Sequence, residues 1–288
     1  MFEGAYTAIA TPFTADGHID HPTLRKLIEF QIAHGMSGIV PAGTTGESPT
    51  LTVEEHIHLI EECVTCVKGR IKVIAGTGGN STEEALELTR HAKSAGADAT
   101  LQVTPYYNKP TQTGLIRHFS AIADVGLPVI LYHVPGRSAC SIDVDTAVEL
   151  SRHPGIVAIK EAGGEVDRTS HIVRRCALTV LSGDDALTLP MMAVGARGVI
   201  SVASNVVPQS VSDLVRAALA GRWDEARKIH LSLHELFGHL FLETNPIPVK
   251  AAMALRGLLQ EQYRLPLCEM NPAKRQILAR TLSLAPAV

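Results

Sequence analysis

The stretch Gly155-Ile156-Val157-Ala158-Ile159-Lys160-Glu161-Ala162 joins an unbroken apolar run to a lysine and a glutamate. Four successive apolar residues, three of them Ile or Val, predict a parallel strand buried on both faces, because a half-solvated strand would alternate apolar and polar side chains. A lysine buried at the end of such a strand loses hydration, which favours its neutral amine, and a neutral amine can form an imine with a carbonyl compound. The alternative is that Lys160 only caps the strand and extends into water.

The composition describes a globular protein with a largely aliphatic core. Hydrophobic residues make up 45% of the chain, charged residues 19% and aromatic residues 4%. The formal net charge of −3 gives no basic surface of the kind that binds nucleic acid. No apolar run is long enough to span a membrane, and the first residues lack the pattern of a secretory signal. We therefore expect a cytoplasmic protein without a nucleic-acid or membrane partner.

Cysteine and histidine spacings predict neither a disulfide framework nor a metal site. The five cysteines are scattered and odd in number, which argues against disulfide pairing. Cys63 and Cys66 form a lone CxxC, and a zinc site would need a second pair. Five positions separate His234 from His239, which places them about 140° apart around a helix and too far around it to share a metal ion. We expect ordinary buried thiols at the CxxC and no metal.

Strand-like and helix-like segments alternate along the chain, which is typical of repeated βα units around a parallel sheet. Eight strands are expected, at residues 6–10, 38–41, 71–75, 99–103, 129–132, 156–160, 179–181 and 198–201. Amphipathic helices are expected between them, for example at residues 22–34, 53–67, 82–95 and 113–123. This pattern predicts a closed (β/α)8 barrel over residues 1–221, with an open doubly wound sheet as the alternative.

Further helical patterns follow the barrel. Residues 222–241, 247–258 and 272–284 have apolar positions at helical spacing. We expect residues 222–288 to form a C-terminal three-helix extension that packs on the barrel or on another subunit. No linker or separate second domain is expected.

Polar clusters follow several of the expected strands, where a barrel builds its active site. After the second strand, the Thr44-Thr45 pair lies between two glycines and can hold a small carboxylate. Tyrosines follow the fourth strand, Tyr132 and Arg137 follow the fifth, and Lys160 ends the sixth. Taken singly, these residues could be a plain turn, buried aromatics or a surface charge. Their joint occurrence favours a site.

These residue types suit imine catalysis without a cofactor. Lys160 would attack a 2-oxo acid, and the protonated imine would act as an electron sink while the adjacent carbon loses a proton to form an enamine. Tyr132 is one strand away and is the candidate acid and base, because a phenol can exchange protons with an amine or a carbinolamine oxygen. Arg137 can hold a carboxylate through two hydrogen bonds.

Two other lysines could compete for this role. Lys250 lies at an expected helix start outside the barrel, and Lys109 lies in a loop. We expect neither to have the burial that favours a neutral amine.

Six short motifs are distributed over the chain: Gly43-Thr44-Thr45-Gly46-Glu47, Thr104-Pro105-Tyr106-Tyr107, Tyr132-His133-Val134-Pro135-Gly136-Arg137, Ile159-Lys160-Glu161-Ala162, Ser182-Gly183-Asp184-Asp185 and Asn245-Pro246-Ile247-Pro248-Val249-Lys250. Together they resemble the dihydrodipicolinate synthase family, part of the pyruvate-dependent class I aldolase superfamily. The resemblance implies a (β/α)8 barrel and a cofactor-free lyase of lysine (diaminopimelate) biosynthesis. Such an enzyme condenses pyruvate with L-aspartate 4-semialdehyde and is usually a homotetramer, a dimer of dimers.

The resemblance also implies residue roles. Lys160 would form the imine with pyruvate, and Tyr132, Thr44 and Tyr107 would form a proton relay. Tyr107 would enter the site from a neighbouring subunit, which would make activity depend on assembly.

Substrate-binding roles follow from the same resemblance. Thr45 and the backbone at Ile200 would bind pyruvate, with Gly183 also in the substrate site. Arg137 would receive the carboxylate of the semialdehyde. His133 stands where asparagine is more usual in the family, which bears on the choice of second substrate.

Some members of the family are inhibited by L-lysine at a subunit interface. The residues that match this effector site are Ser48, His56, Asn80, Glu84 and Tyr106. Val53 replaces a histidine there, and Pro49 is uncommon at its position. The resemblance therefore implies a lysine response that is present but altered.

Two other functions remain open at this point. One is a different pyruvate-dependent aldolase or lyase, acting on N-acetylneuraminate or a 2-keto-3-deoxy sugar acid. Arg137 and the pair Thr44-Thr45 favour the synthase, because those relatives generally alter one or both features. The other is a non-catalytic 2-oxo-acid sensor on the same fold, which would not need both Lys160 and Tyr132.

Overall fold

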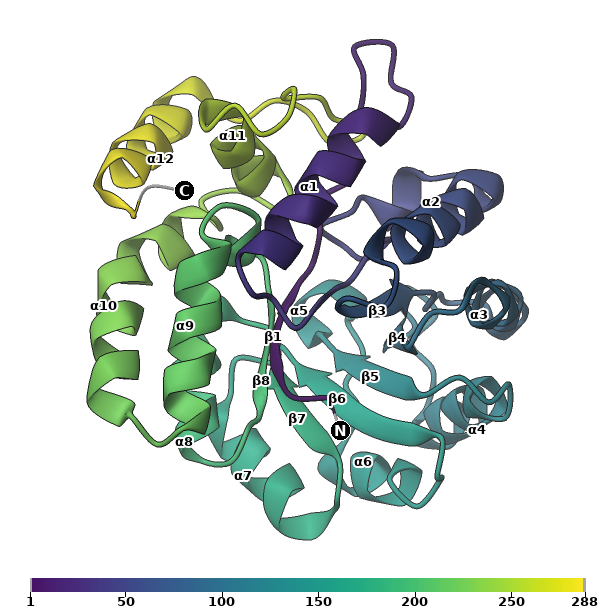
Figure 1. Ribbon diagram of the computed structural model, residues 1–288. Helices are drawn as coiled ribbons and strands as arrows, with labels where there is room; N and C mark the ends of the chain where they lie inside the picture. The colour runs from purple at the N-terminus through teal and green to yellow at the C-terminus, as the bar shows by residue number, and fades with distance from the viewer. Residues whose placement is uncertain (1, 287–288) are drawn as a thin grey trace.

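Eight parallel strands form a closed barrel in the computed structural model, which describes residues 2–286 (Figure 1). The strands pair in sequence order, and β1 pairs with β8 to close the ring. They are β1 (Gly4–Thr7), β2 (Gly38–Ile39), β3 (Lys72–Gly76), β4 (Ala99–Val103), β5 (Val129–His133), β6 (Ile156–Glu161), β7 (Thr179–Ser182) and β8 (Gly198–Ser201). The predicted (β/α)8 barrel is confirmed, and the open sheet is excluded.

The predicted boundaries of β3 to β8 agree with the structure to within one residue, and the larger differences are at β1 and β2. The predicted ranges 99–103 and 198–201 coincide with β4 and β8. The sequence predicts β1 over residues 6–10, but the strand ends at Thr7, and the amide of Ala10 donates to the side chain of Asn205 at 3.1 Å instead of to a neighbouring strand. β2 ends before Pro41, which has no amide hydrogen to continue a ladder.

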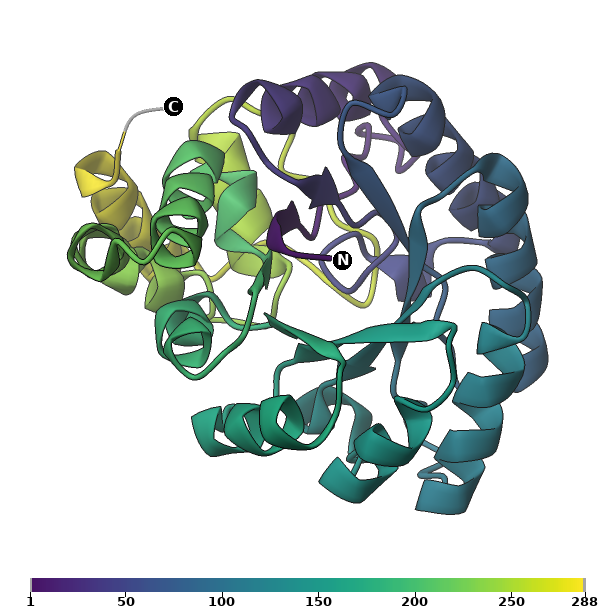
Figure 2. The same cartoon turned by 60° about the horizontal axis from the view of Figure 1, so that its bottom comes forward.

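Helices alternate with the strands and form an outer ring around the barrel, as Figure 2 shows. They are α1 (His21–Ala33), α2 (Val53–Val67), α3 (Thr82–Ala95), α4 (Gln112–Ala123), α5 (Pro135–Ser138), α6 (Val144–Leu150), α7 (Val166–Arg175), α8 (Thr188–Ala193) and α9 (Pro208–Leu219). Short 3-10 segments follow three strands: η1 (Ser48–Thr50), η2 (Asp185–Leu187) and η3 (Ala203–Asn205). The predicted helices at 53–67 and 82–95 coincide with α2 and α3.

Helix α2 shows why the predicted boundaries hold. At its start, the side chain of Thr52 accepts from the amide of Glu55, and the Glu55 side chain accepts from the amide of Thr52, which forms a capping box. At its end, Lys68 and Gly69 adopt φ values of 52° and 70°. This left-handed backbone stops the helix and favours glycine.

Apolar side chains fill one region inside the barrel and another between the strands and the helices. Side chains alternate between the two faces of a strand. Leu131 and Ile159 therefore pack toward the helices. Tyr132 and Lys160, their neighbours in sequence, face the cavity at the end of the barrel.

The chain continues after α9 into α10 (Trp223–His239), α11 (Ile247–Leu255) and α12 (Pro272–Leu284). α10 packs on α9, and α12 contacts α10 and α11 (Figure 1). The prediction extended α11 to residue 258. It ends earlier because Gly257 adopts a φ of 68°. Among residues 2–286, no helix has the length and apolar character needed to cross a membrane.

All five cysteines are free thiols. Cys63 is buried in α2, and burial raises the pKa of its thiol. Cys66 is half-buried. Within the described part of the chain, no group of three or more His, Cys, Asp or Glu side chains is arranged to hold a metal ion.

Arg264, which lies between α11 and α12, ties this region back to the start of α2. Its guanidinium donates to both carboxylate oxygens of Glu55, at 2.7 and 2.6 Å. It also donates to the carbonyl oxygens of Gly17 and Thr50. The hydrogen bond from Arg264 is the main cause that lowers the pKa of Glu55 to about 2.

Replacing Glu55 by Gln should therefore lower stability in a pH-dependent way. The native pKa of Glu55 is below the ordinary value of 4.5, so its contribution is complete above pH 4.5 and disappears as the pH falls towards 2. A partly exposed bidentate pair contributes about 1 kcal/mol, which corresponds to a melting temperature about 2–4 °C lower at pH 7. Thermal unfolding at pH 7 and pH 3 measures this difference, which should be smaller at pH 3. Glu54→Gln, in the same first turn of α2, is the control. An equal loss of stability in Glu55→Gln at both pH values would contradict the assignment.

Candidate active site

Lys160 and Tyr132 lie side by side at the carboxyl ends of β6 and β5. The register pairs Tyr132 directly with Lys160. Both side chains are nearly buried, with 6% and 7% of their surfaces exposed, and the Lys160 Nζ lies 4.2 Å from the centroid of the Tyr132 ring. The structure thus brings together the predicted imine-forming amine and the predicted acid and base.

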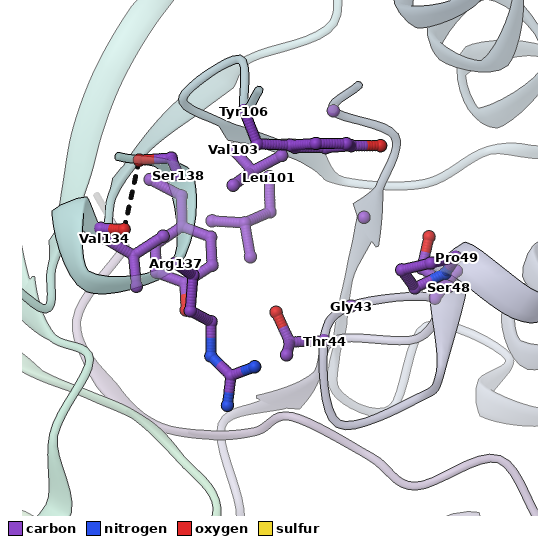
Figure 3. A pocket seen from close by; sticks show the side chains of 14 residues that line it. Gly43, Thr44, Ser48, Pro49, Leu101, Val103, Tyr106, Val134, Arg137 and Ser138 are labelled. Atoms are coloured by element: carbon purple, nitrogen blue, oxygen red, sulfur yellow. Dashed lines mark hydrogen bonds between the residues drawn. The ribbon is translucent and has the colours of Figure 1, made fainter. Parts of the chain in front are cut away.

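These two residues line a cavity of ≈ 140 Å³ at the carboxyl end of the barrel. A second cavity of ≈ 210 Å³ adjoins it and shares Gly43, Thr44, Tyr132 and Arg137 with it. Figure 3 shows Thr44, Arg137 and Tyr106 around the open space of the second cavity. The first cavity is small enough to favour a substrate of few carbon atoms. It is lined by Ala8, Val40, Gly43, Thr44, Thr45, Leu101, Tyr132, Val134, Arg137, Lys160, Ala162, Gly183, Asp184, Val202, Phe241 and Asn245.

A tight turn after β2 carries Thr44 and Thr45. The amides of Gly46 and Glu47 donate to the carbonyl oxygens of Gly43 and Thr44, both at 3.1 Å. A side chain at Gly76 would place its Cβ 2.4 Å from the Ala42 carbonyl oxygen, so only glycine lets β3 lie this close to the turn. As predicted, the turn delivers both threonines to the cavity.

Asn245 is a site residue that the sequence did not single out. Its Nδ2 donates to Thr45 Oγ1 at 3.0 Å, and its carbonyl oxygen accepts from the Arg137 guanidinium at 3.2 Å. Its Oδ1 is buried without a hydrogen-bond partner among the described residues. The sequence feature that could have identified it is its place before Pro246 in the Asn-Pro-Ile-Pro motif.

Gly183 and Ile200 were both predicted to take part in substrate binding. Gly183 lines the cavity, and a Cβ there would lie 2.9 Å from Lys160 Cε, so glycine leaves room for the lysine side chain. Ile200 is buried in β8 within the interior core, and β8 is followed by Val202, which lines the cavity. The role of the Ile200 backbone stays a prediction.

Asp185 holds the chain after β8 in place. Its carboxylate accepts from Ser201 Oγ at 2.5 Å and from the amides of Val202 and Ala203, each at 2.9 Å. Complete burial raises the pKa of this carboxyl, although the three hydrogen bonds oppose the change. Asp185 therefore positions Val202 at the cavity wall.

Tyr107 does not join the other predicted relay residues within this chain. Its side chain is 90% exposed, and its backbone adopts a left-handed φ of 72°. Tyr106 lines the larger cavity, and burial, followed by the charge of Glu84, raises the pKa of its phenol. The structure thus separates the two neighbouring tyrosines.

The residues matched to the lysine effector site lie around the larger cavity. Ser48 and Tyr106 line it. Asn80 donates from Nδ2 to the Tyr106 carbonyl oxygen at 3.2 Å. His56 is buried, its ring nitrogen Nε2 lies 2.7 Å from the Gly76 carbonyl oxygen, and burial lowers the pKa of its imidazole. Glu84 lies on α3, close to Gly79.

His133 and Glu161 form a buried network on the strands that carry Tyr132 and Lys160. They are opposite each other in the β5–β6 register, with His133 Nδ1 2.7 Å from Glu161 Oε1. Arg168 donates to the other carboxylate oxygen at 2.7 Å, and the Gly163 amide donates to Oε1. Burial would raise the pKa of Glu161, but His133 and Arg168 outweigh it and hold this pKa below its ordinary value. The network cross-links the strands that carry Tyr132 and Lys160.

Lys250 is buried, so the expectation that it would lack burial is wrong. Lys109 is exposed, as expected. The side chain of Lys250 is fully inaccessible, and burial lowers the pKa of its amine, while Glu47 acts in the opposite direction. The reason is that the start of α11 packs at the end of the barrel, against Phe13 and Tyr263. Among residues 2–286, Lys250 is paired with a carboxylate and Lys160 is not.

Comparisons with known proteins agree with this geometry. The model of the dihydrodipicolinate synthetase family matches residues 1–285. A 4-hydroxy-tetrahydrodipicolinate synthase of Aquifex aeolicus is 54% identical over 98% of this chain and 97% of its own. The pyruvate complex of the Acinetobacter baumannii dihydrodipicolinate synthase superposes with a TM-score of 0.97, at 44% identity and 99% coverage of both chains. The lysine-bound synthase of Cyanidioschyzon merolae superposes with a TM-score of 0.95, at 40% identity and 98% coverage of both chains. This chain belongs to the dihydrodipicolinate synthetase family.

Proposed function

We propose that this protein is a 4-hydroxy-tetrahydrodipicolinate synthase that condenses pyruvate with L-aspartate 4-semialdehyde. The observation that carries the proposal is the Lys160 amine beside the Tyr132 ring, in a small cavity that also contains Thr44, Thr45 and Arg137. The name of the Aquifex aeolicus relative and the pyruvate complex of the Acinetobacter baumannii protein support the choice of reaction and first substrate.

The reaction begins with covalent capture of pyruvate. The Lys160 amine attacks the C2 carbonyl, and the carbinolamine loses water to give a protonated imine. Thr45 holds the pyruvate carboxylate, since its hydroxyl group can donate a hydrogen bond to it, and Thr44 belongs to the proton relay. Tyr132 transfers protons to and from the carbinolamine oxygen, because its ring contacts the lysine side chain.

The second half of the reaction forms the carbon–carbon bond. The pyruvate methyl group loses a proton, the imine nitrogen takes up the electron pair, and the resulting enamine carbon attacks the aldehyde carbon. The aldehyde oxygen takes up a proton and becomes a hydroxyl. Arg137 receives the semialdehyde carboxylate, with one nitrogen anchored on Asn245 and its other donors free to form a paired contact. The amino group of the semialdehyde then replaces Lys160 in the imine and releases the enzyme.

The first test is a proton NMR time course of pyruvate with the protein in D₂O. Methyl-proton exchange should begin with pyruvate alone, and pyruvate should be consumed only when L-aspartate 4-semialdehyde is added. Lys160→Met should abolish both, whereas Lys26→Met, at an exposed position on α1, should change neither. Exchange without consumption would favour an aldolase for another aldehyde, and no exchange would favour a non-catalytic 2-oxo-acid sensor.

We further propose that Tyr107 completes the relay of a neighbouring subunit in a homotetramer. Its 90% exposure supports this role, because an exposed side chain can reach a second copy.

Tyr107→Phe should lower kcat about a hundredfold, the usual contribution of a proton-transfer group, and still allow borohydride trapping of the pyruvate imine. The test for transfer between subunits mixes Tyr107→Phe with Lys160→Met. Hybrids should regain activity, because a site with intact Lys160 then receives Tyr107 from its neighbour. An unchanged rate in Tyr107→Phe would remove the relay role, and hybrids as inactive as their parents would place Tyr107 in its own site.

We also propose that L-lysine binds between subunits at the larger cavity and inhibits the enzyme. Ser48 and Tyr106 line this cavity together with Thr44. An effector bound there would therefore contact the relay through Thr44. The bound lysine of the Cyanidioschyzon merolae synthase supports the proposal. Val53 and Pro49 alter the neighbourhood, so the strength of inhibition should differ from that of relatives with histidine at position 53.

Glu84→Gln should weaken this inhibition, because it removes a carboxylate that can accept a hydrogen bond from the effector ammonium. Glu83→Gln, exposed in the same turn of α3, is the matched control and should behave as the wild type. Initial rates over a wide range of L-lysine concentrations measure both. A wild-type rate that does not respond to L-lysine would contradict the proposal.

A further inference from the structure

The proposed mechanism does not use a buried ion pair between Lys250 and Glu47. Both side chains are 0% exposed, and Lys250 Nζ lies 2.5 Å from Glu47 Oε1. The ammonium group also lies 4.4 Å from the centroid of the Phe13 ring and 5.2 Å from that of Tyr263. Lys250 and Glu47 are 203 positions apart in the sequence. The pair therefore joins α11 to the turn after β2.

Stability alone gives little reason for such a pair. Removing two charges from water is unfavourable, and apolar side chains of similar volume often give an equally stable or more stable protein. A buried pair that defines the geometry of its surroundings has a clearer function. The surroundings of Glu47 are therefore informative.

Glu47 ends the turn that carries Thr44 and Thr45. Its backbone adopts a φ of 57°, and its amide donates to the Thr44 carbonyl oxygen at 3.1 Å. Its second carboxylate oxygen accepts from the Arg264 amide at 3.2 Å. Since both carboxylate oxygens are held by the C-terminal segment, the position of this turn depends on that segment.

The same segment contacts the site at a second place. Asn245, five positions before Lys250 in the sequence, donates to Thr45 Oγ1 and accepts from Arg137. The stretch from Asn245 to Lys250 therefore contacts Thr45, Arg137 and Glu47. Helix α11 begins within this stretch and provides a rigid support for all three contacts.

We propose that Lys250 and Glu47 are positioning residues, whose buried ion pair fixes the Thr44-Thr45 turn at the distance from Lys160 that pyruvate binding requires. This inference rests on the proposed function, because it assigns Thr45 to pyruvate binding and Thr44 to the relay. It predicts that loss of the pair weakens pyruvate binding and leaves the lysine amine competent to form an imine.

The test is the double variant Glu47→Gln/Lys250→Met, which removes both charges, keeps the length of the side chain at position 47 and shortens the one at position 250 by a single atom. The amide oxygen introduced at position 47 can still accept from the Arg264 amide. We expect a folded protein whose half-saturating pyruvate concentration for borohydride-trapped imine rises about tenfold or more, because small displacements of binding groups have large effects. The amount of imine trapped at saturating pyruvate should stay at the wild-type level.

A matched control removes another ion pair of the same region. Glu261 and Arg275 are paired at 2.8 Å, and among the described residues neither side chain bonds to Glu47, Lys250 or the Thr44-Thr45 turn. Glu261→Gln/Arg275→Met should leave the half-saturating pyruvate concentration unchanged. If Glu47→Gln/Lys250→Met fails to fold, Glu47→Gln alone supplies the measurement. It replaces the ion pair by a weaker hydrogen bond, so the half-saturating pyruvate concentration should still rise, by a smaller factor.

A wild-type half-saturation value in a folded pair variant would overturn the inference and leave the pair with a structural role only. Imine trapping needs pyruvate alone, so an error in the second substrate does not affect this test. A wild-type protein that traps no pyruvate would contradict the proposed function itself, and this outcome is recognised before any variant is measured.

Discussion

The register between β5 and β6 is the constraint on which the site depends. It places Tyr132 opposite Lys160 and, one position on, His133 opposite Glu161. Because side chains alternate along a strand, the first pair faces the cavity and the second faces the helices. A shift of β6 by one residue against β5 would turn Lys160 toward the helices and Glu161 into the barrel interior, so both pairs would be broken. The network therefore favours the one register that brings the phenol beside the amine.

Helices outside the barrel complete the site. The carboxyl ends of the strands supply Lys160, Tyr132 and the two threonines, but the side chains of Thr45 and Arg137 are held by Asn245, at the start of α11. A barrel without this segment would present the same residues with fewer restraints. Precise placement of binding groups matters because the rate of a reaction between bound groups depends strongly on their geometry.

Several ionisable groups are buried around the cavity, and each is stabilised in a different way. Lys250 has a carboxylate partner, Glu161 has His133 and Arg168, and Asp185 accepts hydrogen bonds from backbone amides and from a serine. Lys160 instead lies over an aromatic ring and beside a cavity open to substrate. This contrast distinguishes Lys160, the lysine proposed to react, from the buried lysine with a fixed partner, and burial alone does not make that distinction.

The sequence alone predicted the barrel, the boundaries of α2, α3 and α12 and several residues around the cavity, because periodicity, caps and turn residues act between near neighbours in the chain. It also predicted that the polar clusters meet, since parallel strands in a barrel end at one rim. It did not predict the burial of Lys250 or the role of Asn245. Their partners Glu47 and Thr45 lie about 200 positions away, and no local pattern encodes such a contact. Tertiary structure decides these contacts, because only the folding of the whole chain brings α11 against the turn after β2.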